Sequence, residues 1–97
     1  MKIIINDIEY KLIKDYRDCF DYDEVKEKMT DLDYFDGFDF VFGDFSYDKL
    51  RLKGFCKKGN QSFNSTNDYD KLQDYIDNYC SFGCRYFILE KISDKSK

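Results

Sequence analysis

The stretch FDFVFGDFSYDKLRLKGFC, residues 38–56, has the longest strand pattern in the chain and decides the expected fold class. Phenylalanines occupy every second position from Phe38 to Phe42, and leucines follow the same spacing at Leu50 and Leu52. A period of two is typical of a half-buried strand. Because two neighbouring strands of this length normally pair as a hairpin, we expect a β-hairpin over residues 38–56.

The apolar face that both strands share sets the expected register of this hairpin. A three-residue loop over residues 46–48 places the phenylalanines and leucines on one face. The predicted pairs are Phe38–Cys56, Phe40–Gly54, Phe42–Leu52, Val41–Lys53 and Gly43–Arg51. The sequence therefore predicts one core face, and one face with Arg51 and Lys53 beside the bare backbone of Gly43.

The rest of the chain supplies three more strands and two helices. Residues 2–5 and 8–13 alternate around the turn pair Asn6-Asp7, with Ile5 expected opposite Ile8. Apolar residues at helical spacing predict helices over 22–33 and 68–80, and residues 85–92 predict an interior strand because they are apolar on both faces. We expect one α+β domain over 1–92, a single antiparallel sheet of about five strands with two helices packed on it, and a disordered tail over 93–97.

Charge is unevenly distributed along the 97 residues, although the net charge is only −4. Residues 15–48 carry three bases and twelve acids, whereas residues 49–58 carry five bases and no acid. A basic run of this density is typical of a surface that faces an anion, and it can also pair with the acidic stretch beside it. Both interpretations stay open at this point.

The chain contains no histidine, which removes Ser-His-Asp and Cys-His nucleophile systems and histidine-containing zinc sites. It has neither a phosphate-binding P-loop nor a GxGxxG motif, so the sequence predicts no cofactor. It also has no apolar run of membrane-spanning length and no export signal. We therefore expect a cytoplasmic protein that does not bind a membrane.

The candidate partner-binding residues lie in the central hairpin. Phe45 and Tyr47 are expected as exposed aromatic side chains at its tip, flanking the cations together with Phe55. Asp44 can cap the turn, form an ion pair with a neighbouring cation, or serve as a functional acid. The full candidate set is Gly43, Asp44, Phe45, Tyr47, Arg51, Lys53 and Phe55.

Cys80 and Cys84 form the second candidate site, a C-x3-C pair. They can be structural thiols, because Cys80 lies on the apolar stripe of the second helix, or a redox pair. Zinc would need two further ligands, and Cys19 and Cys56 lie at spacings that match no zinc ribbon or knuckle. We predict no metal site.

Two blocks, FVFGDFSYDKLRLKGF ending at Phe55 and YCSFGCRYFILEK over 79–91, resemble the signature blocks of the YutD-like family, and YKLIKDYRDCF is similar to the start of that family. The resemblance covers about residues 8–92 and implies a small protein of low-G+C Gram-positive bacteria or their wall-less relatives. Phe45, Ser46 and Cys56 depart from the Trp, Gly and Tyr that the family pattern usually has there. The resemblance implies no particular reaction.

These observations favour a non-enzymatic binding module that presents the 38–56 hairpin to a protein or to nucleic acid. The negative net charge disfavours general nucleic-acid binding, because phosphate neutralisation supplies most of that affinity. The alternative is a thiol-dependent redox factor that works through Cys80 and Cys84. The oligomeric state is not predicted.

Overall fold

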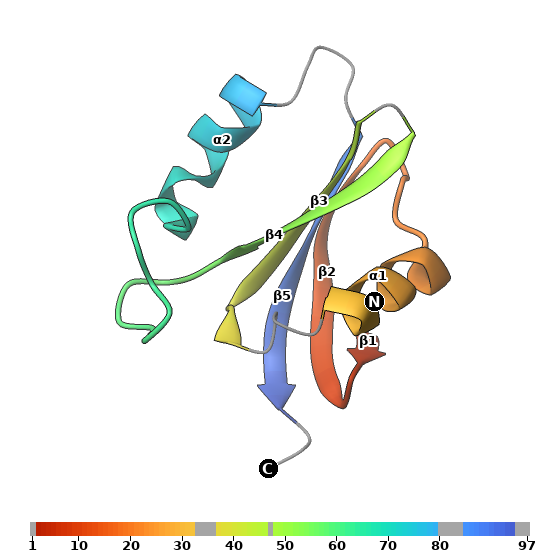
Figure 1. Cartoon of the computed structure of the whole chain (residues 1–97), viewed down its shortest axis with the longest axis horizontal. Helices are drawn as coiled ribbons and strands as arrows, with labels where there is room; N and C mark the ends of the chain where they lie inside the picture. The colour runs from red at the N-terminus through yellow and green to blue at the C-terminus, as the bar shows by residue number, and fades with distance from the viewer. Residues whose placement is uncertain (1, 33–36, 47, 80–84, 95–97) are drawn as a thin grey trace.

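The computed structural model describes residues 2–32, 37–46, 48–79 and 85–94. The elements, in chain order, are β1 Lys2–Ile5, β2 Ile8–Tyr16, α1 Tyr22–Leu32, β3 Phe40–Ser46, β4 Lys49–Phe55, a 3₁₀ turn Tyr69–Lys71, α2 Leu72–Tyr79 and β5 Tyr86–Asp94. The five strands form one antiparallel sheet in the order β1-β2-β5-β3-β4 (Figure 1). This confirms the predicted α+β class and both predicted helices.

The first hairpin has the predicted register. Ile5 pairs with Ile8 and Ile3 with Tyr10, and all four side chains are buried on one face of the sheet. Asn6 and Asp7 both have positive φ, 54° and 65°, as the favoured two-residue hairpin turn requires. A single apolar face and a suitable turn pair therefore specify the same register here.

The two helices cover opposite faces of the sheet (Figure 1). On the α1 face, Val25 and Met29 of the helix are buried against a cluster that includes Val41, Phe87 and Leu89. On the α2 face, Leu72 is buried with Phe40, Phe42, Phe55 and Ile88. The central strands are therefore apolar on both faces, whereas the sequence analysis assumed one apolar face for the central hairpin.

The predicted register of the central hairpin is wrong by one residue. Ser46 pairs with Lys49, which leaves a two-residue connection instead of three, and Asp48 there has φ of 63°. Phe42 consequently lies opposite Lys53, and Gly43 lies opposite Leu52. The alternation could not reveal this error, because a one-residue shift exchanges two faces that are both apolar.

Irregular backbone at Asp39 also divides the phenylalanines that the sequence analysis placed on one face. The N–H of Asp39 donates to the carbonyl of Phe55, the residue already paired with Phe40. Two residues of one strand then oppose one residue of the other, as in a β-bulge. Phe38 packs on the α1 face and Phe40 on the α2 face.

β5 is the interior strand that its apolar sequence predicted, between β2 and β3. It extends to Asp94, so residues 93 and 94 of the predicted disordered tail belong to a strand, and residues 95–97 lie outside the described part of the chain. In the part of the chain that the structure describes, no helix combines the length and the apolar character that crossing a membrane needs.

Candidate functional site

The candidate site is built on β4, whose side chains alternate between cations and leucines. Lys49, Arg51 and Lys53 lie on the α2 face, because they pair with Ser46, Asp44 and Phe42 of β3. Leu50 and Leu52 lie on the α1 face and pack against its cluster. Because β4 is an edge strand, these alternating cations and leucines lie along one border of the sheet.

Arg51 and Asp44 form a bidentate ion pair across the hairpin. The guanidinium Nε lies 3.1 Å from one carboxylate oxygen of Asp44, and Nη2 lies 2.5 Å from the other. The Asp44 side chain is 4% exposed, whereas that of Arg51 is 51% exposed. Of the three roles considered for Asp44, the structure shows the ion pair. The pair fixes the guanidinium and leaves about half of the arginine side chain open to a partner.

Lys53 is held above two aromatic rings of the α2 face. Its ammonium nitrogen lies 5.3 Å from the ring centroid of Phe55 and 5.6 Å from that of Tyr75. A cation at this distance is attracted by the negative face of the ring. The lysine is half-buried, and its charge is positioned between β4 and α2.

These groups line a hollow of about 240 Å³ on the α2 face, which we call the α2-side hollow. Its lining residues are Phe42, Asp44, Arg51, Leu52, Lys53 and Tyr75. Two cations, one carboxylate and two aromatic side chains make this a place for an acidic side chain with an apolar stem, since Asp44 balances one of the two positive charges.

Two of the candidate residues, Phe55 and Gly43, have a different role from the expected one. Phe55 is 1% exposed, so it stabilises the core and supports Lys53 without reaching the surface. Gly43 is buried on the α1 face, and a Cβ there would lie 2.1 Å from Cζ of Phe87. The glycine therefore makes room for a core ring. It does not form a notch beside Arg51.

The aromatic tip is only partly described. Phe45 is half-buried against the α1-face cluster, and the guanidinium carbon of Arg85 lies 4.7 Å from its ring centroid. This corrects the expectation of a freely exposed Phe45. The side chain of Tyr47 lies outside the described residues.

The predicted thiol pair, Cys80 and Cys84, also lies outside the described residues. The two described cysteines, Cys19 and Cys56, are free and buried. Burial, reinforced by the neighbouring Asp15 carboxylate, raises the pKa of Cys19 to about 11, and burial likewise raises the pKa of Cys56. Because the thiolate is the reactive form, neither described thiol is an activated nucleophile at neutral pH.

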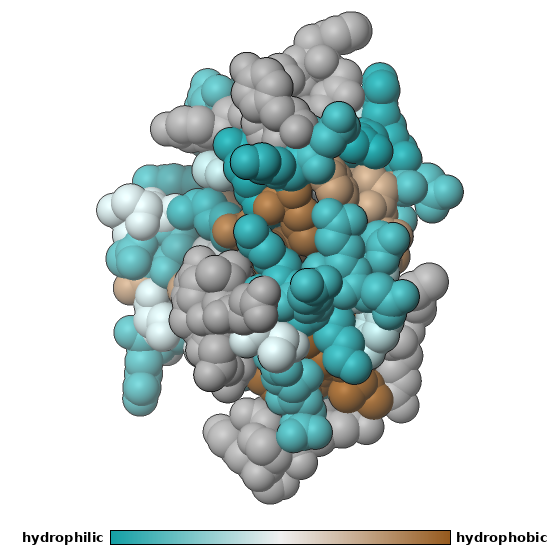
Figure 2. Space-filling model, turned by 45° about the vertical axis from the view of Figure 1, so that its right-hand side comes forward, coloured by the Kyte–Doolittle hydropathy of each residue, from teal (hydrophilic) through white to brown (hydrophobic). Residues whose placement is uncertain are grey.

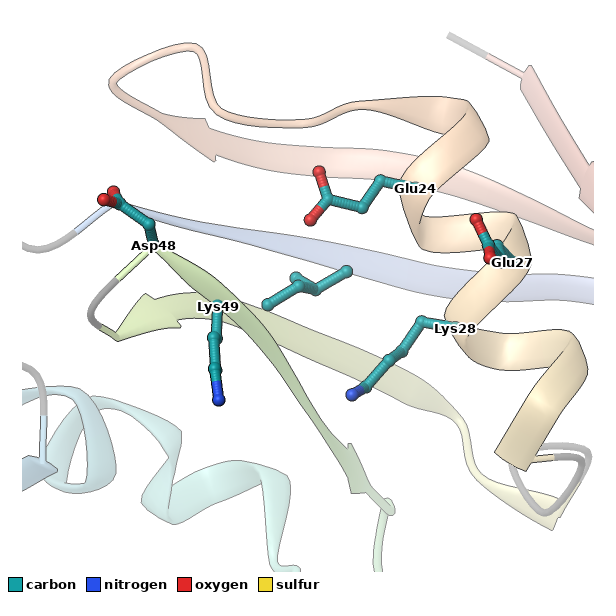
Figure 3. A pocket seen from close by; sticks show the side chains of 6 residues that line it. Glu24, Glu27, Lys28, Asp48 and Lys49 are labelled. Atoms are coloured by element: carbon teal, nitrogen blue, oxygen red, sulfur yellow. The ribbon is translucent and has the colours of Figure 1, made fainter.

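A second hollow, of about 330 Å³, lies between α1 and the end of the central hairpin, and we call it the α1-side hollow. Its lining residues are Glu24, Glu27, Lys28, Asp48, Lys49 and Leu50. Figure 3 shows Lys28 reaching from α1 toward β4, while Lys49 points away from α1. The sequence pattern did not predict this hollow, because its walls come from elements about twenty residues apart. The feature of the sequence that could have indicated this hollow is the acidic stretch 15–48 directly before the basic stretch 49–58.

Basic side chains of the run 49–58 form ion pairs with acidic residues from several parts of the chain. Arg51 pairs with Asp44 from the adjoining acidic stretch. Lys57 lies 4.0 Å from Glu90 on β5, and Lys58 lies 3.6 Å from Asp70. All three basic side chains are at least half exposed, so these pairs leave their charge accessible to solvent.

Comparison with known proteins places this geometry in a family. A family model described as "Putative antitoxin YutD-like" matches residues 4–90. A curated protein of Bacillus subtilis (strain 168), "Putative antitoxin YutD", is 36% identical over 90 residues, which cover 93% of this chain and 97% of that protein. The solution NMR structure of yutD from B. subtilis superposes with a TM-score of 0.76 at 34% identity, covering 98% of this chain and 84% of the other. The chain therefore belongs to the YutD-like family, as the two sequence blocks predicted.

Proposed function

We propose that this protein is a non-enzymatic, cytoplasmic binding module that contacts a partner protein with the β4 side of its central hairpin. The observation that carries the proposal is the Arg51 side chain, which Asp44 holds in place while 51% of it stays exposed. An arginine fixed in this way has lost part of its side-chain entropy before a partner arrives, which favours its use in recognition.

The names of the related proteins support a protein partner. The similar curated protein and the family model both carry the description "Putative antitoxin", and an antitoxin counters a toxin. Binding and covering a toxin requires a surface and no reaction, which agrees with the absence of histidine from the chain. The accessible cations of β4 favour a partner that presents carboxylates.

A nucleic-acid partner fits the same surface less well. The chain has a net charge of −4, and Asp44 neutralises one of the two cations in the α2-side hollow. Because affinity for nucleic acid depends on the number of phosphates neutralised, two or three cations beside a carboxylate support only weak binding.

A capture experiment with matched variants tests this proposal. Tagged wild-type protein is used to isolate partners from the native cell, and binding is then measured with the purified partner. Arg51→Gln with Lys53→Gln removes two charges from the α2-side hollow and leaves a donor for Asp44. Lys57→Gln with Lys58→Gln removes the same charge from the end of the basic run.

We expect the first variant to bind the partner about tenfold more weakly or worse, since losing rim and half-buried charges costs more than about 1.4 kcal/mol in total. The second variant is expected to bind like wild type. Equal binding by the first variant would rule out this surface, and capture of nucleic acid in place of a protein would contradict the proposed kind of partner.

A further inference from the structure

We propose that the partner is bound by strand addition: an extended segment, in which acidic and apolar side chains alternate, pairs with the open edge of β4. This inference rests on the function proposed above and specifies how the partner is recognised. It follows from the direction of the main-chain groups of β4, from the contacts already made at one end of that edge, and from the side chains beside it.

The main-chain groups of Leu50 and Leu52 point away from the sheet. The N–H of Phe45 donates to the carbonyl of Arg85 at 3.2 Å, so the odd-numbered residues of β3 bond toward β5. The even-numbered residues of β3 therefore bond toward β4, where Asp44 and Phe42 oppose Arg51 and Lys53. By alternation, the N–H and C=O groups of the two leucines face outward.

Leu50, Leu52 and Gly54 are the residues of β4 whose main-chain groups face this edge. In the described ranges, no hydrogen bond reaches the outward main-chain groups of Leu50 or Leu52. Figure 1 shows β4 in front of the other strands, with both helices to the sides. An edge strand with unpaired groups is a template for another strand.

The chain itself already extends the sheet at the far end of this edge. The N–H of Cys56 donates to the carbonyl of Asn67 at 2.8 Å, and the carbonyl of Cys56 accepts from the N–H of Tyr69 at 3.0 Å. This parallel bridge between Cys56 and Asp68 uses the outward groups of Cys56, two residues beyond Gly54. A partner segment bound along β4 would extend the sheet edge from Cys56 toward the hairpin connection.

The two hollows lie on either side of the open edge and would receive the side chains of an added strand. Successive side chains of such a strand point alternately to the two faces of the sheet. On the α2 face they would meet Arg51 and Lys53 at the α2-side hollow, which favours carboxylates. On the α1 face they would lie over Leu50 and Leu52, which favour apolar groups, although the other residues that line the α1-side hollow are charged. Figure 2, turned toward α1, shows apolar surface enclosed by hydrophilic side chains on this side of the molecule.

A second copy of this chain is a poor occupant, because β4 does not complement itself. Antiparallel pairing of two β4 strands about Arg51 would set arginine against arginine and Lys49 against Lys53. Like charges placed directly opposite each other destabilise a strand pair. The cations therefore disfavour self-association while they favour an acidic segment.

Synthetic peptides test the inference directly. The probe is a peptide whose core of seven residues, the length of β4, alternates glutamate with valine. One control replaces the glutamates with lysines, and a second groups the glutamates at one end. Two further peptides carry N-methyl groups on the valines only or on the glutamates only. Binding to isotope-labelled protein is followed by NMR, together with the exchange of individual amide hydrogens.

We expect the alternating acidic peptide to bind saturably and to slow amide exchange at Leu50 and Leu52 by about tenfold or more, as new hydrogen bonds protect these groups. In an antiparallel added strand, the residues opposite Leu50 and Leu52, which are the valines, share both main-chain bonds with them, whereas in a parallel strand the flanking glutamates make these bonds. N-methylation of one of these two sets should therefore abolish binding and identify the direction of the added strand, whereas N-methylation of the other set should not. The lysine peptide should not bind.

The inference is overturned if the acidic peptide does not bind, if it binds without slowing exchange at Leu50 and Leu52, or if the grouped peptide binds equally well. The proposed function is judged separately, by the loss of the captured partner in the Arg51→Gln, Lys53→Gln variant. A partner that depends on these two residues but leaves both leucine amides in fast exchange would support the function and reject strand addition.

Discussion

The two edges of the sheet differ in how they end. At β1, four residues long, the outward carbonyl of Ile4 accepts a hydrogen bond of 2.8 Å from the hydroxyl of Tyr22 on α1. The turn beside it is also tied to the helix, because the hydroxyl of Thr30 lies 3.2 Å from Oδ1 of Asn6. Along β4, seven residues long, no other described segment pairs with the outward main-chain groups, and such pairing begins only at Cys56, just beyond the strand.

This difference shows two ways of managing an exposed strand. The β1 edge is short and is closed by the helix that packs against it. The β4 edge is longer and carries cations, which disfavour pairing with a like-charged strand and permit pairing with an acidic one. The closed edge therefore contributes to stability, and we propose the open edge as the place for recognition.

The largest expected effect lies on the closed side. Met29→Ala removes a buried α1 side chain, 2% exposed, from the α1-face cluster. We expect a loss of about 2–5 kcal/mol in the free energy of unfolding, because the cavity adds to the lost burial. Denaturant unfolding measures the loss, and a value below about 0.5 kcal/mol would contradict the view that α1 fastens this side.

An intermediate effect is expected on the open side. Arg51→Leu leaves the nearly buried Asp44 carboxylate without its two guanidinium bonds. We expect a loss of about 1–3 kcal/mol, the usual cost of an unsatisfied polar group. Adding Asp44→Asn to this variant should recover part of the loss in the same unfolding measurement. Equal stability of the single and the double variant would show that the unpaired Asp44 carboxylate is not the cause of the loss.

The smallest expected effect tests the closure of β1 itself. Tyr22→Phe removes the hydroxyl that caps Ile4, and we expect a loss of about 0.5–1 kcal/mol, since the bond is solvent-exposed. Tyr16→Phe is the matched control, because Tyr16 is an equally exposed tyrosine whose ring stacks on Tyr86. The capping role is rejected if the two variants unfold at the same denaturant concentration.

The sequence predicted most of the elements, and it predicted register only where one face of a hairpin is apolar. The first hairpin has its isoleucines on one face and two residues of positive φ at its turn, so its register was predicted correctly. The central hairpin buries Phe42 on one face and Val41 on the other, so alternation alone permitted two registers. The helices on opposite faces, a tertiary feature, decided between them.

The candidate site was predicted in part for the same reason. Arg51 is exposed and forms an ion pair with Asp44, which was one of the roles proposed for Asp44. The error in register placed Gly43 beside Arg51, whereas Gly43 lies opposite Leu52, and it hid the burial of Phe55 under α2. Predicting the α1-side hollow requires the position of α1 relative to β4, and the local sequence pattern does not contain this information.

Amide hydrogen exchange in the free protein tests the central claim most directly. Along β4, the amides of Leu50 and Leu52 should exchange quickly, and those of Arg51 and Lys53, which bond toward β3, should exchange slowly. Slow exchange at all four amides would mean that the β4 edge is already closed in the free protein, and it would contradict the account.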